Sequence, residues 1–174
     1  MNFPFRIIRL GYINKRCQLY TIVKETSELT EASKFIRNPK NAKSDDFDSL
    51  KTRLENIKTR HGARKSFFKP EGKDDGLVFA LHAGKKVQGY LTLNDLRWYC
   101  IRLSERCVIL GNGGIKHVGK TQEDVFLKEK EGDMRFVDRV IEMAQKNEEL
   151  IEDSFGNLQG DLNFSAERIE NYGF

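Results

Sequence analysis

The 174-residue chain predicts a single α+β domain built on one mostly antiparallel β-sheet. Two observations indicate this architecture. Apolar patterns typical of strands and helices follow in the order two strands, two helices, three or four strands and one helix. In addition, residues 96–111 carry two runs rich in β-branched and aromatic residues around a short polar turn, as β-hairpins do. Hydrophobic residues make up 39% of the chain, including 12 Phe, which is enough for a substantial core.

The N-terminal part predicts two strands followed by two helices. The strands cover 5–12 and 17–24. A short helix over 28–37 ends before Pro39, because proline disfavours helical geometry in the residue that precedes it. A second helix covers 45–60, and both helices should pack on one side of the sheet. Its apolar face consists of Phe47, Leu50, Leu54 and Ile57.

The middle of the chain supplies the rest of the sheet. A strand is expected over 77–82 and a further one over 87–93. The hairpin follows, with strands at 97–103 and 106–111 around Ser104-Glu105. The residues expected in the core from these elements are Leu50, Leu54, Ile57, Ile101, Val108 and Leu110.

A C-terminal helix is expected over 134–151, after a polar stretch at 121–132. Its apolar face consists of Met134, Val137, Ile141 and Ala144. Residues 1–152 therefore form the predicted domain. Residues 153–174 form a tail, punctuated by glycine and asparagine, that could fold into a short terminal helix.

Composition limits the function classes. The net charge of +4 is only weak support for nucleic-acid binding. The longest apolar run is far below the ~20 residues that span a bilayer, and the N-terminus has no signal-peptide pattern, so a cytoplasmic protein is expected. Cys17, Cys100 and Cys107 lack metal-ligand spacing. They predict reduced, half-buried thiols, with a disulfide between Cys100 and Cys107 across the hairpin as the alternative.

A glycine-rich segment matches the phosphate-loop pattern G-x-x-x-x-G-K-T. It begins at Gly114, ends at Thr121 and follows an apolar strand. In a phosphate loop a helix follows at once, and a later strand ends in an aspartate that holds magnesium. Residues 122–132 make a poor helix face, and no such strand follows. Chance spacing in a Gly/Lys-rich turn is the simpler explanation, and a nucleotide-binding protein stays an alternative.

Basic side chains gather at one end of the hairpin. Arg97 begins the first strand, and Lys116, His117 and Lys120 follow the second. Pairing around the predicted turn puts Arg97 opposite about position 112, close to this basic group. Alternation along the first strand predicts two faces: Arg97, Tyr99, Ile101 and Leu103 on one, and Trp98, Cys100 and Arg102 on the other.

This chemistry suits RNA cleavage without a metal ion. A 2′-hydroxyl attacks the adjacent phosphate, a cation such as Arg97 or Lys116 stabilises the added negative charge, and a titratable group such as His117 moves the proton. The alternative for each residue is a solvated basic strand end that only supports the sheet.

Four segments carry a resemblance to known proteins. They are the entry strand Tyr20-Thr21-Ile22-Val23-Lys24, the helices within 28–60, the strand Leu96-Arg97-x-x-x-Ile101-Arg102, and Val108-Ile109-Leu110 followed by Gly114-Ile115-Lys116-His117. In pattern and order, over roughly residues 17–125, they resemble the RelE/ParE/HigB superfamily of bacterial type II toxins. The resemblance implies a curved antiparallel sheet.

The resemblance also implies roles for single residues. Arg97 matches the sheet arginine that contacts the scissile phosphate, and Lys116 and His117 match the basic pair after the last strand. Lys85 and Lys86 stand in only approximately for the lysines that nuclease members carry on the preceding strand. The C-terminal catalytic tyrosine of the family has no match here. The chain is also longer than a typical member.

These implications lead to three candidate functions. The first is the toxin of a type II toxin–antitoxin system, an mRNA endoribonuclease that needs no metal or cofactor and acts on free mRNA or on the ribosome. The second is a toxin of the same fold that inhibits a protein such as DNA gyrase without catalysis. The third is the phosphate-loop protein. For the first, the expected partners are mRNA and a small helix-turn-helix antitoxin, with RNA contacts from Lys85, Lys86, Tyr99, Arg102 and Lys120.

Overall fold

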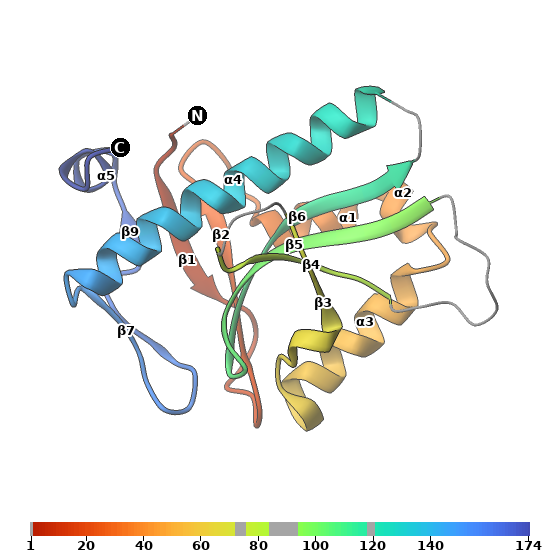
Figure 1. Cartoon of the computed structure of the whole chain (residues 1–174), viewed down its shortest axis with the longest axis horizontal. Coiled ribbons are helices and arrows are strands. Elements are labelled where there is room, and N and C mark those ends of the chain that lie inside the picture. The colour runs from red at the N-terminus through yellow and green to blue at the C-terminus, as the bar shows by residue number, and fades with distance from the viewer. Residues whose placement is uncertain (1, 72–75, 84–93, 118–120) are drawn as a thin grey trace.

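A seven-stranded sheet forms the centre of the molecule (Figure 1). The computed structural model describes residues 2–71, 76–83, 94–117 and 121–174, and within them the strand order is β3-β4-β5-β6-β2-β1-β9. All neighbouring pairs are antiparallel except β2 and β6, which run parallel, so the predicted mostly antiparallel sheet is confirmed. The strands are β1 (Phe5–Arg9), β2 (Gln18–Lys24), β3 (Phe68–Pro70), β4 (Val78–Leu81), β5 (Asn94–Ser104), β6 (Cys107–His117) and β9 (Asn163–Phe164).

Helices cover both faces of the sheet and create two apolar cores. The long helix α4 (Thr121–Lys146) crosses one face, as Figure 1 shows, and buries Val137 against Tyr20 and Ile109. On the other face, α1 (Glu31–Arg37) and α3 (Phe47–Asn56) pack on Trp98 and Leu110. The remaining helical elements are α2 (Pro39–Ala42), η1 (Ile57–His61), η2 (Lys65–Phe67) and α5 (Ala166–Asn171).

Capping residues explain where the first helices begin and end. The Thr30 side-chain oxygen accepts a hydrogen bond from the Ser33 amide at 3.1 Å, which satisfies one unpaired donor at the start of α1. Asn38 ends α1, and its side chain caps α2 by accepting from the Lys40 amide at 3.0 Å. Pro39 occupies the first turn of α2, where its missing N–H costs nothing. The predicted helix end before Pro39 is confirmed.

The β5–β6 hairpin has the predicted faces but a different register. Its two-residue turn is Glu105-Arg106, since Ser104 pairs with Cys107. The register shifts again near Tyr99, where the pairing passes from Trp98↔Gly113 to Cys100↔Leu110. Arg97 therefore lies opposite Gly114 and not opposite position 112. The predicted alternation is confirmed, because Tyr99 and Ile101 lie in the α4 core while Trp98 and Cys100 lie in the α1–α3 core.

The predicted core residues are buried, with one exception. Leu50, Ile57, Ile101, Val108 and Leu110 have almost no exposed area, as do all four apolar residues predicted for the C-terminal helix. Leu54 is only partly buried at the edge of the α1–α3 core. The strand expected over 87–93 lies outside the described residues.

The C-terminal helix begins earlier than predicted. α4 starts at Thr121, although the sequence indicated a polar stretch with a poor helix face up to residue 132. This prediction was wrong because the described side chains before residue 132 give α4 little apolar periodicity. Leu127 is in the core while Val125 and Phe126 stay exposed, and Glu131 pairs with Arg135 one turn later at 2.7 Å.

Residues after 150 contribute to the same fold. β7 (Leu150–Glu152) and β8 (Leu158–Gly160) form a small hairpin, and β9 pairs with β1 at the edge of the main sheet. Phe164 of β9 stacks on Phe5 of β1 with ring centroids 4.8 Å apart. The short terminal helix expected in this region is present as α5.

The three cysteines are free and fully buried. Cys100 lies in the α1–α3 core and Cys107 in the α4 core, so the sheet separates them and the alternative disulfide does not form. Burial raises the pKa of the Cys17 thiol to about 12, which keeps it protonated and unreactive at neutral pH. These side chains are more deeply buried than the sequence suggested.

Candidate functional site

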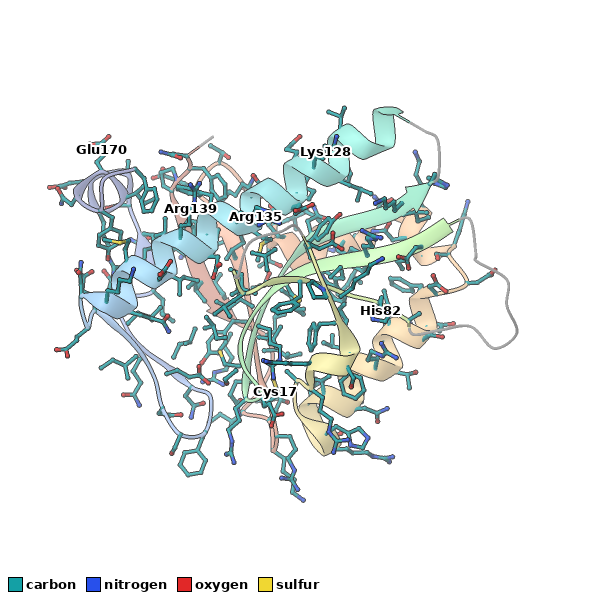
Figure 2. The ribbon with its side chains drawn as sticks, in the orientation of Figure 1. Cys17, His82, Lys128, Arg135, Arg139 and Glu170 are labelled. Atoms are coloured by element: carbon teal, nitrogen blue, oxygen red, sulfur yellow. The ribbon has the colours of Figure 1, made fainter. Side chains whose placement is uncertain are left out.

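A small charged cavity lies between β5, β6, the segment after β3 and α4. Its volume is about 130 Å³, which is enough for a phosphate group. Its walls consist of Glu71, Arg97, Tyr99, Lys116, Leu127, Lys128 and Glu131. We call this cavity the Arg97 pocket. Figure 2 shows Lys128 and Arg135 on α4, the helix that closes one side of it.

Arg97 is held in the pocket by two carboxylates. Its Nη1 lies 3.0 Å from Glu71 Oε1, and its Nε lies 3.1 Å from Asp95 Oδ2. Only 7% of Arg97 is exposed. Burial alone would lower the Arg97 pKa, but Glu71 and Asp95 raise it overall, so the guanidinium stays charged. The arginine is thus a fixed cation beside an enclosed space.

Glu71 is the acidic counterpart of Arg97. It follows β3, and its side chain is 10% exposed. Burial raises its pKa, partly offset by the Arg97 and Lys116 charges, while Glu131 raises the pKa further. Arg135 of α4 fixes this segment, because its Nη2 donates to the Glu71 carbonyl oxygen at 2.6 Å. A half-buried carboxyl with a raised pKa next to cations can act as a general base or acid.

The structure brings Arg97 and Lys116 together but separates His117 from them. Lys116 pairs with Asp95 and shares its face of the sheet with Arg97, whereas His117 pairs with Asn94. Because neighbouring residues of a strand point to opposite faces, His117 lies on the other side of β6. The three predicted catalytic residues therefore do not form one cluster.

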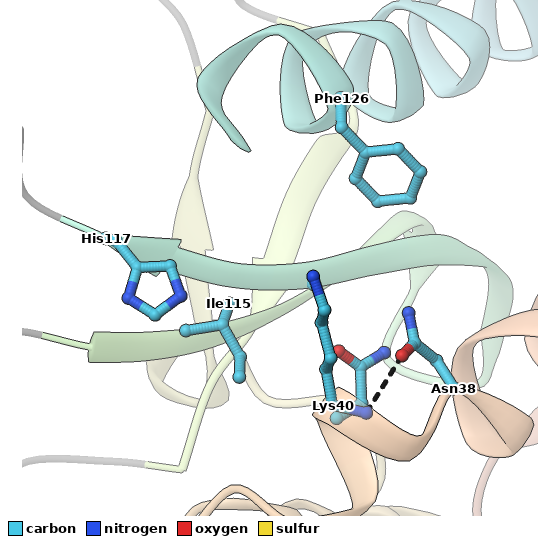
Figure 3. A pocket seen from close by; sticks show the side chains of 7 residues that line it. Asn38, Lys40, Ile115, His117 and Phe126 are labelled. Carbon is cyan, nitrogen blue, oxygen red and sulfur yellow. Dashed lines mark hydrogen bonds between the residues drawn. The ribbon is translucent and has the colours of Figure 1, made fainter. Parts of the chain in front are cut away.

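His117 lines a different pocket at the edge of β6 (Figure 3). This pocket has a volume of about 300 Å³. In Figure 3, Asn38 and Lys40 lie on one side of it and Phe126 of α4 on the other, with Ile115 and His117 along β6. Its lining is more apolar than that of the Arg97 pocket.

Two predicted RNA-binding residues are buried. Tyr99 is 2% exposed in the α4 core, and burial raises the pKa of its hydroxyl, so only its edge reaches the Arg97 pocket. Arg102 is 8% exposed, and its Nε donates to the Ala63 carbonyl oxygen at 2.6 Å. Both predictions were wrong as surface contacts, because alternation along β5 directs these side chains into the two cores. Lys85, Lys86 and Lys120 lie outside the described residues.

The phosphate-loop pattern falls on regular strand structure. Residues 114–117 belong to β6 and pair with 94–97 of β5. Such an extended backbone cannot curl its amide groups around a phosphate, as a phosphate loop must. Residues 118–120 lie outside the described part of the chain, and α4 begins at Thr121. Among the residues that the structure describes, no three His, Cys, Asp or Glu side chains could together hold a metal ion.

Sequence reasoning missed Glu71, Asp95, Lys128 and Glu131. Glu71 lies 26 residues before Arg97, in a connection that showed neither periodicity nor a motif. Lys128 and Glu131 lie in the stretch that was not expected to be helical. The one available signal was Asp95, two positions before Arg97 on the same strand and therefore on the same face.

No helix in the described part of the chain is long and apolar enough to cross a lipid bilayer. Comparison of the chain with known proteins found no relative. The chain matches no protein-family model, no curated protein and no solved structure.

Proposed function

We propose that the chain is the toxin of a type II toxin–antitoxin system and that it cleaves mRNA without a metal ion. The observation that carries this proposal is the Arg97 pocket, where two cations, Arg97 and Lys116, share a phosphate-sized space with Glu71. Positive charge at a phosphate and a proton acceptor beside it are the two requirements for attack by a 2′-hydroxyl.

Each group has a defined role in this proposal. An entering phosphate replaces the Glu71 carboxylate at the Arg97 guanidinium. Glu71 then takes the proton from the 2′-hydroxyl, whose oxygen attacks the phosphorus. Arg97 and Lys116 stabilise the extra negative charge, the 5′-oxygen leaves, and solvent supplies its proton. His117 takes no part in proton transfer, since it lies on the other side of β6.

Glu71→Gln tests this assignment directly. Gln keeps the shape but cannot accept the proton, so cleavage of a labelled RNA should fall by about 10² to 10⁴-fold. The raised pKa of Glu71 also predicts the pH profile. The carboxylate is the active form, so the parent's cleavage rate should fall with acidification at a higher pH than for an ordinary glutamate. Glu71→Gln has no carboxylate to protonate, so its residual cleavage rate should not show this fall with acidification.

The matched control is His117→Ala, a change on the opposite face of the same strand. It should cleave RNA at nearly the parent rate. EDTA should not abolish the parent activity. If Glu71→Gln cleaves as fast as the parent, or if His117→Ala loses activity in its place, the proposed assignment is wrong.

A second candidate is a toxin of the same fold that inhibits a protein such as DNA gyrase without catalysis. The observation that favours it is the closed state of Arg97, which two carboxylates already neutralise. The two candidates separate when growth is measured together with RNA cleavage. Growth arrest that persists in Glu71→Gln without any cleavage would favour inhibition of a protein target.

A further inference from the structure

A second charged surface lies at the opposite end of the β5–β6 hairpin from the Arg97 pocket. About seven residues of β5 separate Arg97 from Ser104, which at roughly 3.3 Å per residue is about 23 Å. Six exposed cations surround the hairpin turn there: Lys15, Arg16, Arg60, Arg64, Lys65 and Arg106. We call this region the hairpin-tip surface.

Backbone hydrogen bonds bring these residues together from distant parts of the sequence. The Arg16 amide donates to the Lys58 carbonyl at 2.9 Å, and the Ala63 amide donates to the Glu105 carbonyl at 2.7 Å. These bonds join the β1–β2 loop and the end of η1 to the β5–β6 turn. Figure 2 shows Cys17, the residue after Arg16, near this end of the molecule. The cluster is therefore a feature of the fold and not of one sequence run.

The β7–β8 hairpin completes the surface. Gly156 has a φ of 86°, which side-chain-bearing residues rarely adopt. It also packs so close to the Arg106 carbonyl that a Cβ would overlap the carbonyl oxygen. The side-chain Nε2 of Gln18 donates to the backbone carbonyl oxygens of Asn14 (2.7 Å) and Phe155 (3.4 Å). One side chain therefore connects the β1–β2 loop with the β7–β8 loop. Three hairpin tips thus form one rigid platform.

None of these six cations takes part in an ion pair with any residue that the structure describes, in contrast to Lys51 and Lys146 elsewhere on the surface. Lys58, which lies beside Arg16, pairs with Glu55. The one exposed acid on the turn is Glu105. With Glu152 and Asp153 of the β7–β8 hairpin counted beside Glu105, cations still outnumber acids on this surface six to three. Such a local concentration is typical of a surface that binds a polyanion.

Exposed apolar side chains lie beside the cations. Tyr12 is 92% exposed, Ile13 73% and Phe155 65%, and the first two belong to the same loop as Lys15 and Arg16. Aromatic side chains left this open among cations match the chemistry of a single-stranded nucleic acid, whose bases stack on rings while its phosphates meet lysine and arginine. An anionic membrane would also take exposed apolar side chains beside cations, so vesicle binding is one outcome of the test below.

We propose that the hairpin-tip surface binds single-stranded RNA, apart from the Arg97 pocket and through phosphate contacts and base stacking on Tyr12 and Phe155. The choice of RNA over DNA rests on the proposed nuclease function. On this basis, the surface holds a substrate or ribosomal strand at a distance from the cleaved bond and contributes to affinity without contributing to chemistry.

The test measures binding without cleavage. A fluorescent 2′-O-methyl RNA of 20 nucleotides cannot be cleaved by attack of a 2′-hydroxyl, so its anisotropy reports binding whether or not Glu71 and Arg97 are catalytic. The variant is R16E/R64E/R106E. The control, R37E/K51E/K146E, changes the net charge equally at exposed cations elsewhere. We expect the first variant to bind at least tenfold more weakly than the control.

Salt dependence and stacking give two further readouts. For a single-stranded nucleic acid, each phosphate contact contributes about 0.7 to the steepness of a plot of log K against log salt concentration. The first variant removes three cations, so the steepness of its plot should fall by about 2. Y12A/F155A should weaken binding about tenfold or more, while Y12F should not. Arg16→Gln, Arg64→Gln and Arg106→Gln, made singly, repeat the test if the triple variant does not fold.

Several results would overturn the proposal. One is equal RNA affinity of the two triple variants. Another is a parent protein that binds vesicles rich in phosphatidylserine but not RNA, which would assign the surface to membranes. Loss of cleavage in Glu71→Gln with unchanged binding of the modified RNA would leave this proposal intact, so the two proposals fail separately.

Discussion

Arg97 and Glu71 hold opposite charges in a place that water hardly reaches, with side-chain exposures of 8% and 10%. One interpretation of Arg97 from the sequence was a solvated basic strand end, whose loss would have little effect on folding. Its burial changes that expectation, because removing one member of a buried ion pair leaves the other charge without its partner. The sequence could not reveal this, since Glu71 belongs to an irregular connection and meets Arg97 only through the pairing of β4 with β5.

Arg97→Ala should therefore lower the free energy of unfolding by about 3 kcal/mol, the typical cost of leaving a buried charge unpaired. The double variant R97A/E71Q removes both charges and should recover part of this loss. Urea unfolding of the parent, the single and the double variants measures the coupling. Equal stability of the parent and Arg97→Ala would mean that the ion pair contributes nothing to folding. It would also mean that activity data on Arg97→Ala need no correction for stability.

At the scale of elements, the β5–β6 hairpin shows what local patterns can and cannot predict. Alternation of side chains assigned Tyr99, Ile101, Trp98 and Cys100 to the correct faces, since alternation is a local property of a strand. The register depends on the turn, which lies one residue later than predicted, and on two irregularities that shift the pairing in opposite directions. His117 pairs with Asn94, and alternation along β6 sets it apart from the pocket. The start of α4 was missed because a solvent-facing helix end carries little apolar periodicity.

Gly113 makes the close approach of the two strands possible, and its substitution tests this. A Cβ at Gly113 would overlap the Arg97 carbonyl oxygen. Gly113→Ala should therefore destabilise the protein by about 1–3 kcal/mol, as overpacked sites do. Gly132 in α4 is the matched control, because a Cβ there meets no atom within 4 Å. Gly132→Ala should stabilise the protein by about 0.5–1 kcal/mol, since alanine favours helix. Thermal or urea unfolding that ranks the two variants in the reverse order would contradict the described register.

At the scale of the whole molecule, the two proposed functional surfaces lie at opposite ends of one hairpin, and helices cover both faces of the sheet between them. The sequence predicted the sheet and the helices of 28–60 on one side of it, since these helices carry a clear apolar face, but it did not assign the C-terminal helix to a face. It did not predict the hairpin-tip surface. The six cations come from four separate segments that the fold brings together. Residues 58–65 carry four cations and no acid, but they lie in a connection to which the sequence assigned no role.

A proposed antitoxin is expected to cover the Arg97 pocket, because an unneutralised toxin of this kind arrests its host. Co-expression with the product of the adjacent reading frame, followed by a pull-down, should recover a stable complex. RNA cleavage should be suppressed in that complex. Lys116→Glu, at the exposed mouth of the pocket, should weaken the complex at least tenfold, while Lys146→Glu on the far end of α4 should not. Failure to recover any complex would count strongly against the toxin proposal.

The pairing of β1 with β9 has a consequence for how the chain is made. The two strands are neighbours in the sheet, yet about 150 residues are synthesised between them. At translation rates of roughly 5–20 residues per second, β1 waits on the order of 10 s for the strand that covers its edge. During that interval the edge of β1 and the ring of Phe5 lack their final partners. The nascent chain is then open to strand addition by other chains, so the yield of native protein should depend on how fast ribosomes deliver the last elements and on chaperones that shield β1 until they arrive.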